Sequence, residues 1–400
     1  MKIVHIEDFF HPNAGYQINV LPKYMVKQGH NVTIVTSEMD KIPESLTSFF
    51  GRENIEQSDE KYTQQTGVNI IRLPLRGFLS GRAIFDKNLE KTIKEIMPEI
   101  LYVHGNDTLT GMKYIWKISK LEFPIISDSH MLEMASANPF NKIYRMCYKV
   151  FITPKIKKHQ LKIIRTQDDS YVNRCLGIPL KQCPWISVGS DTMLFYPNNE
   201  VKKAFREQHK ISMNDFVVVY TGKLDDSKGG KFLAETLLQK FYNTRNKKVV
   251  IIVIGNTAGE YGKEVERIFE RSENKIIRIS TQKYIDLAQF YQSADLSIFP
   301  KQCSLSFYDA QACGLPVISE DNNINIDRLM NNNGFNFIAG NINDFREKII
   351  KCIEMDDIKY KKMSENAYEF VKENYDYEII AQQYTSILAN ELQKFKEKRS

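Results

Sequence analysis

The chain has 400 residues, of which 42% are hydrophobic and 26% are charged, with a formal net charge of +6. This length indicates two domains, and so mild a charge does not indicate a protein that binds nucleic acid over its whole surface. The six cysteines are scattered without a C-x-x-C pair, which argues against a disulfide framework or a thiolate metal site and favours the cytoplasm. Met1 leads straight into the strand-like KIVHI, so we expect no signal peptide, and no apolar run reaches the roughly 20 residues of a membrane span.

Short β-branched apolar runs alternate with stretches of helical period, which is typical of a parallel sheet covered by helices. The pattern stops near Asn198, at a polar connector, and then starts again. We therefore predict an α/β protein of two doubly wound domains, residues 1–197 and 198–376, followed by a helix at about 377–400. The predicted strands are 2–6, 31–36, 69–73, 100–104, 124–127, 163–167 and 185–188, then 216–221, 249–254, 275–279, 296–299, 317–319 and 335–338; the predicted helices include 16–28, 85–96, 108–120 and 142–151.

The most informative segment is residues 298–319, IFPKQCSLSFYDAQACGLPVIS. An apolar strand ends at a proline, and a polar loop leads into a helix that carries one acid, Asp309. Phosphates and ribose bind at the carboxyl edge of such sheets, where a carboxylate accepts hydrogen bonds from ribose hydroxyls. We therefore expect Asp309 to hold a ribose; the alternative is a helix-face acid with no ligand.

A second candidate site is TGKLDDSKGGKFLAETL, which starts at Thr221. A strand ends at Gly222, Lys223 follows, and Lys228 precedes two glycines and an amphipathic helix. Lysines, and glycines that allow close approach of the backbone, suit a diphosphate when they lie in the loop between a strand and the next helix. The alternative interpretation of this segment is a solvated basic turn. Near the amino terminus, Gly15 opens a helix and would let a phosphate or an acceptor hydroxyl approach the backbone, although a plain turn fits as well.

Two histidines stand at predicted strand ends, where sites collect. His130 in ISDSHMLE is a stronger candidate than His104 in LYVHGND, and the alternative for both is a packed histidine that donates to the backbone. No cluster of His, Cys, Asp and Glu has the spacing of metal ligands, so we expect chemistry without a metal or another cofactor.

Residues 134–167 contain no acid but eight lysines and arginines, interleaved with aromatic and aliphatic residues. Such a basic amphipathic surface suits the anionic inner face of the cytoplasmic membrane or a lipid pyrophosphate acceptor. No nucleic-acid motif accompanies it, so we expect no nucleic-acid partner, and the remaining alternative is a solvated lysine-rich face. The residues assigned to this acceptor or membrane face are Lys142, Arg145, Lys149, Lys155, Lys157 and Lys158.

Together these segments resemble the family-four glycosyltransferases of the retaining GT-B type, in particular those that build bacterial surface polysaccharides. HPNAGYQINV and GHNVTIVTS, then PIISDSHMLE, SVGSDTMLFYP, TGKLDDSKGG and QFYQSADLSIFP, are similar to the family's motifs and come in the same order. The resemblance covers nearly the whole chain. It implies two Rossmann-like domains that face a central cleft, with the last helix crossing back onto the first domain.

The resemblance also implies roles for particular residues. A nucleotide-diphosphate sugar would be the donor, held mainly by the second domain, and the acceptor would lie against the first. His130 falls on the family's active-site histidine, and Lys223 and Lys228 fall where the family neutralises the leaving diphosphate. The donor-binding positions implied in this way are Gly15, Gly222, Lys301, Ser304, Leu305 and Asp309.

The sequence departs from the family at the first acid of its paired-acid signature. Lys301 stands eight residues before Asp309, and Asp309 itself replaces the usual glutamate. In the family the first acid faces the donor sugar, so the resemblance leaves the sugar open. A lysine there would add positive charge near the diphosphate or the sugar.

We therefore predict a cytoplasmic, membrane-peripheral and metal-independent glycosyltransferase. It would move a hexosyl or N-acetylhexosaminyl group from a nucleotide sugar to a glycan or a lipid-linked oligosaccharide. The alternatives are transfer to a small soluble acceptor and a catalytically silent GT-B scaffold that binds nucleotide.

Overall fold

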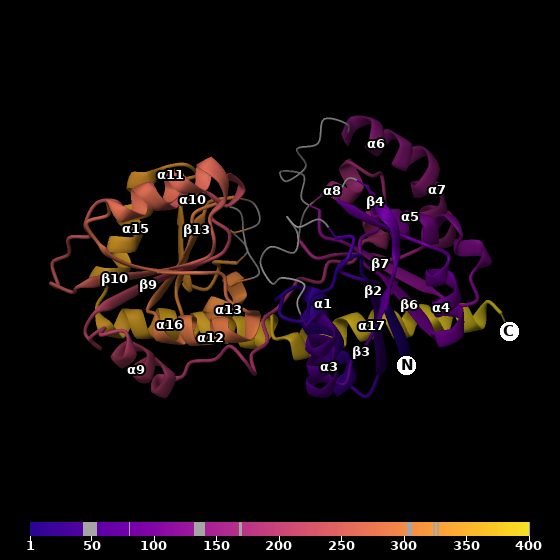
Figure 1. The fold of residues 1–400 in the computed structure, drawn as a ribbon, viewed down its shortest axis with the longest axis horizontal. Coiled ribbons are helices and arrows are strands. Elements are labelled where there is room, and N and C mark those ends of the chain that lie inside the picture. Colours follow the sequence, from indigo (N-terminus) through magenta and orange to yellow (C-terminus); the bar gives the residue numbers. More distant parts are fainter. Residues whose placement is uncertain are drawn as a thin grey trace. The chain divides into compact units, whose positions relative to one another are not determined.

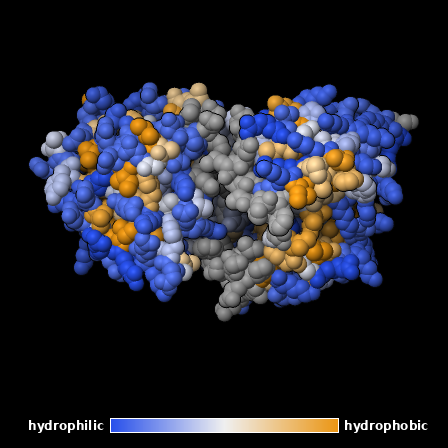
Figure 2. All heavy atoms as spheres, turned by 90° about the horizontal axis from the view of Figure 1, so that it is seen from above, coloured by the Kyte–Doolittle hydropathy of each residue, from blue (hydrophilic) through white to orange (hydrophobic). Residues whose placement is uncertain are grey.

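The computed structural model describes residues 1–42, 54–79, 81–131, 141–167, 170–301, 306–322, 325 and 328–399. The chain divides into two compact units, and each is a sheet with helices around it (Figure 1). We call Met1–Val188 with Tyr377–Ser400 the first unit and Gly189–Asp376 the second unit. Hydrophilic side chains cover most of the face seen in Figure 2, as expected when the apolar strands lie inside.

The first unit is built on six parallel strands in the order β3-β2-β1-β6-β7-β8. The strand order reverses between β1 and β6, which are hydrogen-bonded neighbours. β6 and β7 are buried along their whole length, as expected for central strands of a covered parallel sheet. The strands are β1 (Lys2–Ile6), β2 (Asn31–Ser37), β3 (Asn69–Leu73), β6 (Ile100–Val103), β7 (Ile125–Ser129) and β8 (Ile163–Arg165).

Helices connect these strands, because a parallel pair needs a crossover. In α1 (Gln17–Lys27) the apolar residues Ile18, Leu21 and Met25 recur at helical spacing and are all buried. The other helices of this part are α3 (Ile55–Thr66), α4 (Asn88–Ile96), α5 (Leu109–Trp116), α6 (Asn141–Cys147), α7 (Thr153–His159) and α8 (Tyr171–Arg174), with a π-helical turn η3 (Tyr148–Ile152) and 3₁₀ turns η1 (Ile118–Lys120) and η4 (Leu180–Gln182).

The second unit repeats this topology with strand order β11-β10-β9-β12-β13-β14. β9 and β10 are the apolar runs FVVVYT and VVIIVI, and every residue in both is buried. The strands are β9 (Phe216–Thr221), β10 (Val249–Ile254), β11 (Lys275–Ile279), β12 (Leu296–Phe299), β13 (Val317–Glu320) and β14 (Gly334–Phe337). The helices are α9 (Asn199–Gln208), α10 (Gly230–Thr236), α11 (Gly259–Glu270), α12 (Ala288–Ser293), α13 (Ser306–Ala312), α15 (Ile342–Glu354) and α16 (Asp357–Asn374), with 3₁₀ turns η5 (Asp226–Lys228) and η6 (Tyr284–Leu287).

Two local predictions were wrong. The predicted strand 185–188 is reduced to an isolated bridge between Arg165 and Trp185. The chain also contains an antiparallel pair that the sequence pattern did not reveal, β4 (Leu75–Leu79) and β5 (Arg82–Phe85). Its strands are short, and Gly81 takes a positive φ of 78° between them, as a tight connection requires. The predicted helix from residue 85 consequently begins only at Asn88.

The boundary between the units lies earlier than the predicted 197/198. Residues 189–197 group with the second unit. Ser190 accounts for this placement, because its backbone N–H donates to the carbonyl of Tyr375 at 2.8 Å and its hydroxyl donates to Asp309 at 2.7 Å. Hydrogen bonding rather than a change in composition therefore decides where the second unit begins.

The last helix, α17 (Tyr377–Glu397), belongs to the first unit. It packs along α1, where the fully buried Tyr384 accepts a hydrogen bond of 2.6 Å from the side-chain amide of Gln17. The rings of Tyr24 and Tyr377 stack with centroids 6.1 Å apart. The chain thus returns to complete its first unit. No helix in the described part of the chain is both long and apolar enough to span a membrane.

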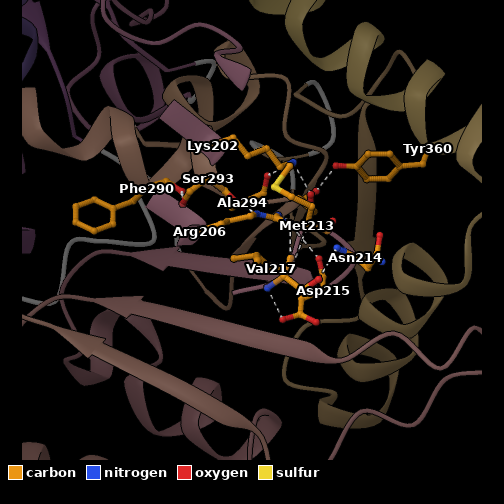
Figure 3. Close-up of polar contacts among 12 residues, drawn as sticks. Lys202, Arg206, Met213, Asn214, Asp215, Val217, Phe290, Ser293, Ala294 and Tyr360 are labelled. Carbon is orange, nitrogen blue, oxygen red and sulfur yellow. Dashed lines mark hydrogen bonds and ion pairs between the residues drawn. The ribbon is translucent and has the colours of Figure 1, made fainter. Parts of the chain in front are cut away.

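A cluster of charged side chains fastens α9 to the sheet of the second unit (Figure 3). The guanidinium of Arg206, only 1% exposed, bonds Asp295 Oδ2 at 2.7 Å. Lys202 Nζ bonds the other carboxylate oxygen at 2.6 Å, and the backbone N–H of Val217 donates to Oδ2 at 2.8 Å. The remaining guanidinium N–H groups donate to the carbonyls of Ser293, Ser212, Met213 and Asp215.

Candidate functional site

In the second unit, the strand order reverses between β9 and β12, the place where open α/β sheets bind ligands. The exposed Gly222 and Lys223 follow β9, and Lys301 follows β12 two residues beyond Phe299. Tyr220 fixes the first of these connections, since its hydroxyl donates to the carbonyl of Lys223 at 2.6 Å. The fold therefore brings the two predicted donor segments to one edge.

The turn that carries Lys228 is held from two sides. The carboxylate of Asp225 accepts the backbone N–H of Lys228 at 3.0 Å, and Lys301 Nζ donates to the carbonyl of Asp226 at 3.0 Å. Gly229 has a positive φ of 73°, and a Cβ there would lie 3.2 Å from the Cβ of Lys301. Lys301, which stands where the resemblance places an acid, thus joins the turn to the end of β12.

Asp309 is buried on α13, with only 2% of its surface exposed. Its Oδ1 accepts a hydrogen bond of 2.7 Å from the hydroxyl of Ser190 and a longer one of 3.4 Å from the hydroxyl of Tyr284. Burial raises the pKa of Asp309 to about 8, although the bond from Ser190 opposes the shift. Such a carboxyl group can both donate to and accept from a pair of ligand hydroxyls. Ser304 and Leu305, also predicted to contact the donor, lie outside the described residues.

In the first unit, four side chains form a chain of polar contacts that leads from the interior to the surface. His5 Nδ1 lies 2.9 Å from His104 Nε2, and His104 Nδ1 lies 2.9 Å from Asp128 Oδ2. The same oxygen is 3.2 Å from His130 Nε2. His5 is completely buried, whereas the side chain of His130 is 45% exposed. The predicted His130 is therefore the outer end of a longer arrangement.

Asp128 is the centre of this arrangement. Its carboxylate also accepts the hydroxyl of Tyr102 at 2.8 Å and the backbone N–H of Gly105 at 2.6 Å. Burial would raise the pKa of Asp128, but His104 and His130 hold it well below its usual range. Burial alone would lower the pKa of His130, but the carboxylate of Asp128, together with Glu7 and Asp107, raises that pKa overall. The positive charge is thus favoured on His130, at the surface.

Ligand-type atoms of His104, Asp128 and His130 lie within 4.8 Å of one another, the composition of a metal site. The sequence did not reveal this group, because its members come from two separate strand ends. Each imidazole already has a protein contact at its other nitrogen, His104 with His5 and His130 with the hydroxyl of Thr166 at 3.2 Å. That the chemistry needs no metal stays a prediction.

Two acids at the end of β1 were missed from the sequence. Asp8 is buried, and its Oδ2 accepts a hydrogen bond of 3.2 Å from the backbone N–H of Ala83. Burial, followed by the charge of Glu7, raises the pKa of Asp8 to about 7, and burial also raises the pKa of Glu7. The sequence did contain an indication of this pair, because Glu7 and Asp8 directly follow the apolar strand KIVHI. Gly15, in the connection that follows, stands immediately before Tyr16, the N-cap of α1.

The predicted basic face lies on α6, η3 and α7. Arg145 is only partly exposed, and its guanidinium lies 5.3 Å from the ring of Tyr171. Lys155 Nζ lies 5.1 Å from the ring of Trp116. The exposed members are Lys142, Lys149, Lys157 and Lys158.

Comparisons with known proteins agree with this architecture. Residues 201–370 match the family model "Glycosyl transferases group 1", so the second unit contains a group 1 glycosyltransferase domain. A probable sucrose-phosphate synthase of Thermosipho melanesiensis is 24% identical over 95% of this chain and 92% of its own length.

Solved structures extend the similarity to both units. The sucrose-phosphate synthase of Thermosynechococcus elongatus has a TM-score of 0.68 at 17% identity, covering 97% of this chain and 98% of that one. Anabaena HepE, solved with UDP and glucose, has a TM-score of 0.72 at 17% identity, covering 98% of this chain and 100% of that one. With two six-stranded parallel sheets, these similarities confirm the predicted GT-B fold.

Proposed function

We propose that this chain, which carries a group 1 glycosyltransferase domain, transfers a hexosyl group from a nucleotide-diphosphate sugar to an acceptor hydroxyl. The observation that carries the proposal is the edge where β9 and β12 end. There the turn with Lys228 is fixed by Asp225 and Lys301, and the fold brings Lys223 to the same edge. Lysines stabilise the charge that develops on a departing diphosphate.

Asp309 and His130 complete the proposed roles, one in each unit. Asp309 would bond the ribose hydroxyls, which fits a buried carboxyl that has few bonds from the protein itself. His130 would contact sugar through its exposed edge, oriented from behind by Asp128. The reaction would proceed with retention and without a metal.

The acceptor has two candidates. Two of the similar proteins are named sucrose-phosphate synthases, which favours a small soluble acceptor. The second candidate is a glycan or lipid-linked oligosaccharide of a bacterial surface polymer, which would place the enzyme on the inner face of the cytoplasmic membrane. The exposed lysines of α6, η3 and α7 favour this second candidate.

Thermal-shift screening against UDP-, GDP-, ADP- and TDP-sugars tests the donor. A true donor at ~100-fold excess over its dissociation constant should stabilise the protein by roughly 2.7 kcal/mol. Mass spectrometry of reactions with sugar phosphates and with lipid-linked saccharides then separates the two acceptors.

Lys228→Ala should abolish both the shift and transfer. Lys248→Ala is the control, since this exposed lysine precedes β10 at the opposite edge of the sheet. Binding without transfer to any acceptor would instead support the silent scaffold. No binding to any nucleotide sugar would overturn the proposal.

A further inference from the structure

Residues 141–159 form one continuous helical segment made of α6, η3 and α7. Its inner side is fixed in the first unit, where Tyr148, Ile152 and Ile156 are buried. The hydroxyl of Thr153 secures it further by donating to the carbonyl of Leu176 at 2.6 Å. The direction in which the outer side points is therefore set by packing.

The outer side of this segment is unusual because it is apolar. Ile143, Met146, Val150 and Phe151 are 60%, 61%, 58% and 56% exposed. In Figure 2, which looks down on the end of the first unit where α6 and α7 lie, apolar residues gather among hydrophilic ones. We call these four side chains the apolar stripe.

A helix of the second unit shows what an ordinary solvent-facing side looks like in this chain. α15 buries Phe345, Ile349, Cys352 and Ile353. Its exposed residues are all polar or charged: Asn343, Glu347, Lys351 and Glu354. A surface helix normally keeps its apolar residues on the core side. The apolar stripe therefore needs a partner that α15 does not need.

The charges around the apolar stripe identify the partner's chemistry. Residues 141–167 contain no Asp or Glu, and Lys142, Lys149, Lys157 and Lys158 are exposed on the same segment. Trp116, 52% exposed at the end of α5, lies beside α7 through its contact with Lys155. Apolar side chains bordered by lysines, with a tryptophan at the margin, match the boundary between acyl chains and anionic headgroups.

We propose that the apolar stripe and its lysines bind the surface of an anionic phospholipid membrane. The apolar side chains enter the acyl boundary, and the lysines contact lipid phosphates. A nucleic acid would satisfy the lysines but would leave four large apolar side chains in water, so the bilayer is favoured. This proposal deepens the second acceptor candidate of the proposed function, because it names the surface that would bind the membrane. Vesicle binding requires no turnover, so the proposal can fail independently of sugar transfer.

Flotation of the purified full chain with vesicles tests the proposal. We expect co-flotation with vesicles rich in phosphatidylglycerol and none with pure phosphatidylcholine. Met146→Ser with Phe151→Ser, and separately Lys157→Glu with Lys158→Glu, should each reduce the bound fraction by about tenfold or more. Circular dichroism melts check that the variants remain folded, and Met146→Ser alone replaces the double variant if that one does not.

Matched controls come from α16 of the second unit. Ile358 is 84% exposed, and Lys361 and Lys362 form a similarly exposed pair. Ile358→Ser and Lys361→Glu with Lys362→Glu should leave vesicle binding unchanged. The proposal is overturned if the wild-type chain does not float with anionic vesicles, if it binds RNA but not vesicles, or if the apolar variants bind as well as the wild type does.

Discussion

Replacing Asp295 by Asn is the sharpest test of how the second unit is held together. This carboxylate bonds the buried guanidinium of Arg206 at 2.7 Å and Lys202 at 2.6 Å. The substitution keeps the shape but removes the negative charge. The side-chain oxygen of Asn can still accept the backbone N–H of Val217, so the change isolates the ionic part of the cluster.

The two cations contribute unequally. Lys202 is 22% exposed and can turn to water, so its pair with Asp295 accounts for about 1 kcal/mol or less. Arg206 is 1% exposed and cannot turn to water. A buried charge that loses its partner destabilises the folded protein by roughly 3–5 kcal/mol. Its bonds to four backbone carbonyls remain, which favours the lower end. We expect a loss of about 3 kcal/mol of unfolding free energy, a large part of the 5–15 kcal/mol typical of a domain.

The assay must separate the two units, because a two-unit chain need not unfold in one step. Both tryptophans, Trp116 and Trp185, lie in the first unit, so their fluorescence follows that unit alone. Hydrogen exchange of peptides from β9 and β10 follows the second unit in increasing urea. Asp295→Asn should lower the urea midpoint of these peptides by far more than it lowers the fluorescence midpoint.

Glu365→Gln is the control, because it removes one charge from an exposed pair with Lys361 at 3.9 Å and should cost less than about 0.5 kcal/mol. If Asp295→Asn changes the stability of the second unit no more than Glu365→Gln does, the ion pair with Arg206 does not stabilise that unit as predicted.

Further predictions concern the site. Unfolded aspartate titrates near pH 3.9, whereas folded Asp309 has a pKa of about 8, so between these values only the folded chain holds the proton and stability falls as pH rises. Asp309→Asn should therefore melt above the wild type near pH 9 but not near pH 4, and equal pH dependence of the two proteins would contradict this. Gly255→Ala should destabilise the protein by more than about 2 kcal/mol, because the added Cβ would lie 1.9 Å from the carbonyl oxygen of Gly222. Gly259→Ala is the comparison, since Gly259 also has a positive φ but nothing lies within 4 Å of the added Cβ. In denaturant melts this second variant should lose only about 1 kcal/mol. Prolonged dialysis against EDTA should leave transfer activity unchanged. A loss of activity that Zn²⁺ or Mn²⁺ restores would contradict this, and His104, Asp128 and His130 would then be the candidate ligands.

Much of the fold could be predicted because it depends on local patterns. Apolar runs such as FVVVYT and VVIIVI are long, β-branched and bordered by polar residues, so their strand positions were predicted without error. The repetition of the same alternation after Asn198 predicted a second domain. The hairpin at residues 75–85 was missed because its strands are short and its pairing depends on a glycine turn.

The candidate site could be predicted only where its members are close in sequence. Lys223, Lys228 and Asp309 belong to recognisable strand–loop–helix segments. The contact between His5 and His104 joins residues 99 positions apart, and no spacing rule reveals such a pair. The role of Lys301 also depends on a long-range contact, since its side chain bonds the carbonyl of Asp226, 75 positions away.

The return of α17 to the first unit has a consequence for how the protein comes to be folded. The second unit is one uninterrupted stretch, residues 189–376, so all of its contacts are available before α17 has been synthesised. The first unit lacks Tyr384, the buried partner of Gln17, until α17 has been made, and 367 positions separate the two residues. During synthesis, therefore, the part of the chain that is made first is the part that is finished last. A nascent chain stalled within α17 should hold a protease-resistant second unit beside a first unit that is still open to cleavage.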